Sequence, residues 1–105
     1  MVFVAADATQ VVGFVSIGEN VHWTGELDAY IGELVVREGH EKQGVGTRLV
    51  RRAELWAAER GLRRIRLSTG AANAAALHLY DALGYQREDV TLSKRVPGSP
   101  DRRRP

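Results

Sequence analysis

The chain has 105 residues, which is enough for one domain with a modest hydrophobic core. It contains no cysteine, so a disulfide framework, a thiolate nucleophile and a cysteine-ligated metal are all excluded. The net charge is +2, and it comes from the C-terminal tail, where three arginines (102–104) stand against Asp101.

The two ends of the chain carry little information about partners. The first six residues are apolar but have neither the charged start nor the cleavage pattern of a signal peptide, and no stretch is long enough to span a bilayer. We therefore expect a cytoplasmic protein. Residues 97–105 contain all three prolines and read as a disordered appendage to a domain over residues 1–96. Three arginines are too few to indicate nucleic-acid binding.

The first third of the chain predicts three strands. Residues 2–5 and 11–17 are β-rich runs separated by the turn residues 7–9, and they predict an antiparallel hairpin. Residues 18–20 are expected to end the second strand, with a loop or an edge extension over residues 22–26. Residues 30–36 predict the third strand, which is β-branched towards its end.

A long amphipathic helix follows. Val45, Leu49, Ala53 and Trp56 recur at helical spacing, with arginines on the opposite side. Gly61 follows the last turn and is well placed as a left-handed stop. Residues 64–69 then alternate apolar and polar side chains, which predicts a fourth strand.

Asn73 and Gly84 bracket a second, shorter helix. Val90, Leu92 and Lys94 alternate along a last strand that reaches Val96. The predicted order is β-β-β-α-β-α-β. A right-handed crossover should join the third and fourth strands in parallel. This predicts an α/β (α+β) fold, a mixed sheet with helices packed against it.

The run Glu41-Lys42-Gln43-Gly44-Val45-Gly46-Thr47 lies between the third strand and the long helix. Its glycines let the backbone approach a ligand closely, and a helix N-terminus behind it favours phosphate. A dinucleotide fingerprint would need a third glycine where Leu49 stands, and the P-loop pattern is absent. Two interpretations are left. The loop is either a pyrophosphate cradle of the kind acyl-coenzyme A users have, or only a tight strand-to-helix turn.

The second helix carries the pattern N-x-x-A-L-x-x-Y-x-x-L-G-Y, from Asn73 to Tyr85. Together with Q-G-V-G-T after a strand that ends Leu34-Val35-Val36, it resembles the GNAT superfamily of N-acyltransferases, over roughly Val11 to Val96. The resemblance implies an enzyme that transfers acetyl from acetyl-coenzyme A to an amine by direct attack.

The resemblance also implies roles for individual residues. The third strand would pair with the pantetheine and the acyl carbonyl, and the loop amides would cradle the pyrophosphate. Asn73 would hydrogen-bond the pantetheine arm beside Ala76. Tyr80 would protonate the departing thiolate, which a phenol can do, although its spacing also fits plain core packing. The implied coenzyme residues are Leu34, Val35, Val36, Lys42, Gln43, Gly44, Val45, Gly46, Thr47, Asn73, Ala76 and Tyr80.

Two features depart from the family pattern. Glu41 stands where the family usually has Arg or Gln, and its charge should weaken coenzyme binding. The family also carries a strand and helices before the hairpin, which help to form the acceptor pocket. We therefore expect a homodimer that covers the exposed sheet surface. The alternative is a catalytically silent acyl-coenzyme A-binding module that acts with a partner chain.

The general base is left open by the sequence. Glu33, on the strand beside the expected coenzyme groove, is the first candidate, and Asp28 and His22 follow. Each could equally be a solvated surface residue. Protein N-terminal acetylating members of the family often have Glu where Ser68 stands, which disfavours that subtype. The three histidines have no ligand spacing, so no metal is expected.

Overall fold

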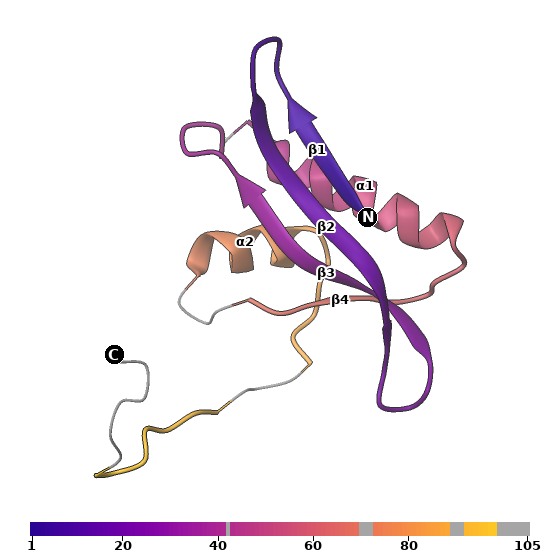
Figure 1. The fold of residues 1–105 in the computed structure, drawn as a ribbon, viewed down its shortest axis with the longest axis vertical. Helices are drawn as coiled ribbons and strands as arrows, with labels where there is room; N and C mark the ends of the chain where they lie inside the picture. The colour runs from indigo at the N-terminus through magenta and orange to yellow at the C-terminus, as the bar shows by residue number, and fades with distance from the viewer. Residues whose placement is uncertain (42, 70–72, 89–91, 99–105) are drawn as a thin grey trace.

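The computed structural model describes residues 1–41, 43–69, 73–88 and 92–98. It is a four-stranded sheet in the order β1-β2-β3-β4, with two helices (Figure 1). The first three strands are antiparallel, and β4 runs parallel to β3, as the sequence predicts for a strand–helix–strand unit. The predicted fold class is confirmed. The elements are β1 (Val2–Ala6), β2 (Val11–Val21), β3 (Leu27–Val36), α1 (Val45–Glu59), β4 (Ile65–Leu67) and α2 (Ala74–Ala82).

The second strand is longer than its sequence indicates. The prediction that residues 18–20 end it is wrong, because β2 continues to Val21 and pairs there with Leu27. The first residues of β3 supply the hydrogen-bond partners that hold this extension in the sheet, which outweighs the weak strand propensity of Gly18. The loop over residues 22–26 is confirmed and closes with a hydrogen bond from His22 N–H to Glu26 O, 2.7 Å.

The core lies between one face of the sheet and α1. The helix packs on β2 and β3, and its buried stripe meets the inward side chains of these strands. Gly61 follows the helix with φ +72°, as predicted for a left-handed stop. Neither described helix is long and apolar enough to cross a membrane. The buried core residues are Val12, Val15, Ile17, Ala29, Ile31, Val45, Leu49, Val50, Ala53, Ala57 and Tyr80.

The predicted last strand is wrong where the structure can test it. Residues 92–96 form no strand, and Leu92 and Val96 are 87 % and 66 % exposed. Alternating side chains make a strand only where a sheet edge and a buried face receive it, and these exposed side chains have neither. Val90 and tail residues 99–105 lie outside the described residues.

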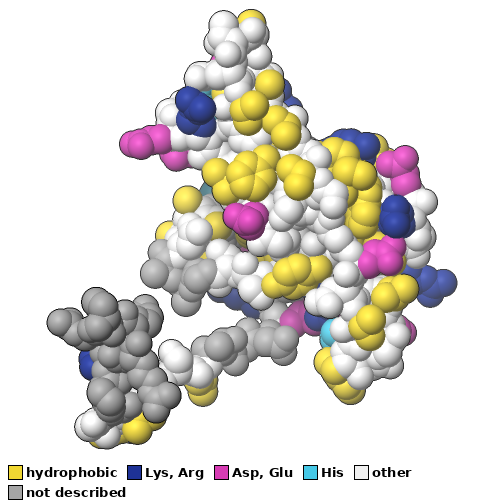
Figure 2. All heavy atoms as spheres, viewed as in Figure 1, with side chains coloured by type: hydrophobic (Ala, Val, Ile, Leu, Met, Phe, Trp, Pro, Cys, Tyr) yellow, Lys and Arg dark blue, Asp and Glu magenta, His cyan; other side chains and the backbone are white. Residues whose placement is uncertain are grey.

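The opposite face of the sheet is not covered by the described helices. In Figure 1 the strands β1 and β2 pass in front of α1, so the viewer looks at this open face. Val4, Phe14 and Val35 are cross-strand neighbours on it, and Val2 lies beside them on β1. Val2 and Val4 are each 56 % exposed. Figure 2 shows hydrophobic side chains spread across this surface.

Candidate functional site

The site begins where β3 and β4 part. Among the described residues the two strands pair only at Ala29–Ile65, Tyr30–Arg66 and Ile31–Leu67. β3 then runs on to Val36, and in the described part of the chain no strand pairs with its β4-facing edge beyond Ile31. A free strand edge offers unpaired backbone groups to a ligand that can lie along it.

A β-bulge sits at the point of divergence. Ser16 pairs with Glu33 and Ile17 pairs with Ile31, so Gly32 is the extra residue. The Glu33 N–H donates to Ser16 Oγ at 2.8 Å. A Cβ at Gly32 would lie only 2.9 Å from that oxygen, so a larger residue would displace the Ser16 hydroxyl from this hydrogen bond.

The bulge decides which way the later residues of β3 face. Strict alternation from buried Ile31 would turn Glu33 inward, but the extra residue reverses this. Glu33 therefore shares the open face with its partner Ser16. Leu34 and Val36 turn towards the helices and pack against the core.

The bulge also sets the direction of the backbone amides. The Ala29 N–H donates to Arg64 O on the β4 side, whereas the Arg37 N–H donates to Val12 O on the β2 side. The Glu33 N–H also points towards β2, where it donates to Ser16 Oγ. Because successive N–H groups alternate in direction along a strand, the N–H groups of Leu34 and Val36 face the other edge, on the β4 side. These are the two residues expected to pair with a pantetheine arm through their backbone.

A pocket of about 100 Å³ opens between the parted strands and the start of α2. It brings together five of the predicted site residues: Glu33, Leu34, Asn73, Ala76 and Tyr80. Val35 and Val36 are not among its lining residues, and Val35 turns its carbonyl towards Gly13 of β2. The other lining residues are Ile31, Gly32, Leu67, Ser68 and Thr69.

Tyr80 is the buried aromatic wall of this pocket. It is 7 % exposed and belongs to the core cluster, so the packing interpretation of its spacing is confirmed, and it also lines the pocket. Its hydroxyl makes no hydrogen bond with the described residues. Burial raises the pKa of the Tyr80 phenol above its usual value, so the group carries its proton at neutral pH. A protonated phenol beside a pocket can act as a general acid.

Asn73 has a structural role that the sequence also indicates. It is the N-cap of α2, and its Oδ1 accepts a hydrogen bond from the Ala76 N–H at 3.2 Å. The cap fixes the side chain at the mouth of the pocket. Its Nδ2 donors have no partner among the described residues, which leaves them available to a ligand carbonyl.

The glycine loop places the N-terminus of α1 at the end of the same gap. Gly44 is the N-cap with φ +76°, a conformation that glycine adopts without strain, and no side chain caps the helix. A Cβ at Gly46 would come within 3.2 Å of Leu79 and 3.8 Å of Val36, so the helix start packs closely between α2 and β3. The amides of the first turn, residues 45–47, have no acceptor within the helix and can bind an anion.

The remaining loop residues are only partly described. Lys42, a predicted coenzyme residue, lies outside the described residues. Gln43 is held by His40, whose Nδ1 lies 3.0 Å from Gln43 Oε1. Glu41 is exposed.

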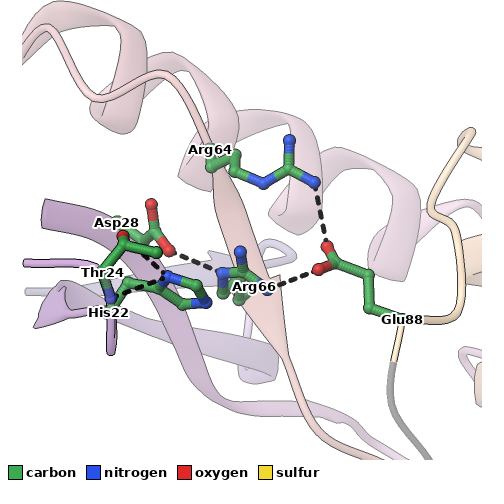
Figure 3. Close-up of polar contacts among 6 residues, drawn as sticks. All are labelled: His22, Thr24, Asp28, Arg64, Arg66 and Glu88. Carbon is green, nitrogen blue, oxygen red and sulfur yellow. Dashed lines mark hydrogen bonds and ion pairs between the residues drawn. The ribbon is translucent and has the colours of Figure 1, made fainter. Parts of the chain in front are cut away.

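The two lower-ranked base candidates lie away from the pocket. Asp28 is buried, 4 % exposed, and its Oδ2 pairs with Arg66 Nε, while Arg66 Nη1 donates to Glu88 Oε2 at 2.7 Å (Figure 3). His22 lies in the β2–β3 loop with its Nδ1 3.0 Å from Thr24 Oγ1. Neither lines the pocket, so Glu33 is the carboxylate that the structure brings to it. No cluster of potential metal ligands occurs in the described part of the chain.

Sequence reasoning missed this ion-pair network. It ties β3, β4 and the segment after α2 together at the closed end of the gap, and Arg64 adds a second hydrogen bond to Glu88 at 3.1 Å. The alternation of Arg64 and Arg66 was the available signal. The bulge was missed as well, although Gly32 inside a strand pattern is a known sign of one.

Comparison with known proteins identifies the architecture. The family model described as "Acetyltransferase (GNAT) family" matches residues 1–85. The chain belongs to the GNAT acetyltransferase family. This GNAT chain is 33 % identical over 85 residues to N-alpha-acetyltransferase 30 of Schizosaccharomyces pombe, which covers 81 % of this chain and 57 % of that protein.

Solved structures of GNAT proteins agree. A Pyrococcus furiosus protein assigned as an acetyl transferase superposes with a TM-score of 0.83 at 30 % identity, over 90 % of this chain and 64 % of that one. The NatC complex bound to Gag peptide and CoA contains a chain with a TM-score of 0.77 at 27 % identity, over 84 % of this chain and 58 % of that one. This GNAT chain thus spans less than two thirds of the length of these relatives. That Ser68 disfavours the N-terminal acetylating subtype stays a prediction from the sequence.

The ion-pair network generates a prediction about acid stability. The Arg66 hydrogen bond, and then that of Arg64, lower the pKa of Glu88 below its ordinary value of 4.5. A carboxyl group whose pKa is lower in the folded state than in the unfolded state stabilises the fold at pH values above its unfolded-state pKa. This stabilisation is lost as the pH falls through the folded-state pKa. We expect Glu88→Gln to lower the urea midpoint at neutral pH and to match the wild type well below pH 4.5.

The matched control is Glu59→Gln, which removes one exposed ion pair with Arg52 on α1. It should change the midpoint less, because isolated surface pairs contribute little. A midpoint difference for Glu88→Gln that stays constant across the acid range would contradict the role of this carboxylate.

Proposed function

We propose that the protein is an N-acetyltransferase that transfers acetyl from acetyl-coenzyme A to an amine. The observation that carries this proposal is the pocket at the parting of β3 and β4, where Glu33 and Tyr80 both lie at the free edge of β3. Membership of the GNAT family supports the reaction class, and the CoA in the similar NatC structure supports the cosubstrate.

The residues present fit the coenzyme. The first-turn amides of α1 and the positive end of its dipole suit a pyrophosphate. The free-edge amides of Leu34 and Val36 suit the amide-bearing pantetheine arm, and Asn73, whose side-chain amide can donate, lines the same pocket. All these groups come from elements that meet at the gap, so an extended ligand could contact them together. Glu41 is the unfavourable member of the set, because its charge repels phosphate.

Glu33 and Tyr80 lie on opposite sides of the sheet. Glu33 comes from the open face, and Tyr80 comes from the helix that packs with α1 on the other face. In the proposed reaction the amine nitrogen attacks the thioester carbonyl carbon, and the carbon–sulfur bond breaks as the tetrahedral intermediate collapses. Glu33 takes the amine proton on one side, and Tyr80 gives its proton to the departing sulfur on the other. A β3 amide at the free edge polarises the carbonyl.

The acceptor would approach from the open face, where Glu33 lies. The similarity to N-alpha-acetyltransferase 30, and to a NatC chain in a complex with a peptide, makes the α-amino group of a polypeptide the first acceptor to test. We further propose that a second copy of the chain covers the apolar part of this face, around Val4 and Phe14. A cytoplasmic location remains a prediction from the sequence.

The first prediction concerns coenzyme binding at the α1 N-terminus. Gln43→Glu adds a negative charge there, which should stabilise the helix through its dipole. The same charge repels the pyrophosphate, so the Kd for coenzyme A should rise about tenfold, which corresponds to roughly 1.4 kcal/mol. Glu41→Gln should lower the Kd. Isothermal titration checks both, with Gln86→Glu as a control of equal charge away from the loop. Equal Kd values for all variants would remove the loop from the site.

The second prediction concerns turnover. Tyr80→Phe keeps the ring but removes the proton donor, so kcat should fall about a hundredfold while coenzyme A binding stays nearly unchanged. Release of free thiol during acetylation of a peptide and amine panel is the measurement. Unchanged kcat would remove Tyr80 from the mechanism. Binding without turnover of any amine by the wild type would instead favour a silent coenzyme-binding module.

The third prediction concerns the open face. Size-exclusion chromatography with light scattering should give a dimer at micromolar concentration, because exposed apolar sheet surface favours self-association. Val4→Lys should shift the mass to that of a monomer, whereas Leu55→Lys, on the outer side of α1, should not. A wild-type monomer would contradict the proposed assembly.

A further inference from the structure

Tyr85 lies directly behind the proposed proton donor. It follows the turn that ends α2, and its N–H donates to Tyr80 O at 2.9 Å. The two rings meet edge to face, with centroids 5.4 Å apart and planes at 66°. This geometry is favourable for aromatic pairs and fixes one ring relative to the other.

A side chain of the other helix anchors Tyr85 in turn. Its hydroxyl donates to Glu54 Oε2 of α1 at 2.9 Å, in a partly buried position. A hydrogen bond to a carboxylate is stronger than a neutral one. Burial, followed by the Glu54 hydrogen bond, raises the pKa of the Tyr85 phenol, so this hydroxyl holds its proton and does not compete with Tyr80 as a donor.

Tyr80 needs such support because its own hydroxyl makes no hydrogen bond with the described residues. Within the described residues the ring is held by packing, and a proton donor that tilts by a fraction of an ångström loses efficiency. The contact with Tyr85 is the directional part of that packing, and Glu54 sets where Tyr85 stands. The chain of contacts therefore runs from α1 through Tyr85 to the pocket.

We propose that Glu54 and Tyr85 form a positioning pair that holds the Tyr80 hydroxyl at the pocket for proton transfer to the leaving thiolate. This inference rests on the proposed function. Neither residue touches the substrate. Their effect on turnover depends on the position of Tyr80, and this distinguishes the pair from residues that only pack in the core.

The test is a set of variants in two backgrounds. Tyr85→Phe and Glu54→Leu should each lower kcat about tenfold with the KM for acetyl-coenzyme A unchanged. Glu54→Gln should restore the wild-type kcat, because its amide oxygen accepts the same hydrogen bond. In a Tyr80→Phe background, Tyr85→Phe should have no further effect on kcat. Glu59→Gln, on the exposed side of α1, is the matched control.

A second readout needs no turnover. The chain has three tyrosines, so the ring signals of Tyr80 can be assigned by labelled-tyrosine NMR. These signals should shift in Tyr85→Phe and Glu54→Leu and return to wild-type positions in Glu54→Gln. Unchanged Tyr80 signals, or an equal loss of kcat in the Tyr80→Phe background, would overturn the positioning role. Wild-type protein without turnover but with these NMR shifts would overturn the proposed function alone.

Discussion

The parting of β3 from β4 after three paired residues is the constraint on which the rest of the site depends. Past Ile31 the backbone amides on this edge of β3 have no strand partner among the described residues, and the pocket lies there. The close packing of Gly46 against Leu79 and Val36 holds the start of α1 beside α2 and the end of β3. At its closed end, the buried Asp28–Arg66 ion pair joins the two strands. A buried carboxylate needs such a partner, because an unpaired charge there would destabilise the fold.

The bulge at Gly32 gives the gap two chemically different sides. One inserted residue sends Glu33 to the open face and turns Leu34 and Val36 towards the helices. A carboxylate on one side of the sheet and a buried phenol on the other suit the proposed reaction, because one proton is taken from the amine and another is given to the sulfur of the tetrahedral intermediate. The hydrogen bond from Glu33 N–H to Ser16 Oγ replaces the ladder bond that the bulge disrupts. A larger residue than glycine would displace that oxygen.

Local rules account for what the sequence predicted well. The stripe that begins at Val45, the cap at Asn73 and the stop at Gly61 depend on residues within one or two turns of each other, so their spacing is visible in the chain. The glycine loop and the pattern around Tyr80 are local in the same sense, and they were enough to predict the fold class and the pocket-lining helix. The prediction of a last strand is wrong because alternating side chains show only that a segment is able to form a strand. They do not show whether a sheet edge is available to pair with it.

By itself, the sequence determined the order of the elements from β1 to α2, the helix termini and the residue types available for acyl transfer. The tertiary structure alone decided which of them meet. Strand register turned Glu33 outward, since one extra residue reverses every later side chain. The pairs Asp28–Arg66 and Glu54–Tyr85 join residues 38 and 31 positions apart, and no local spacing encodes them. Such contacts form only when the sheet and both helices have packed, because packing then brings the partners within hydrogen-bonding distance.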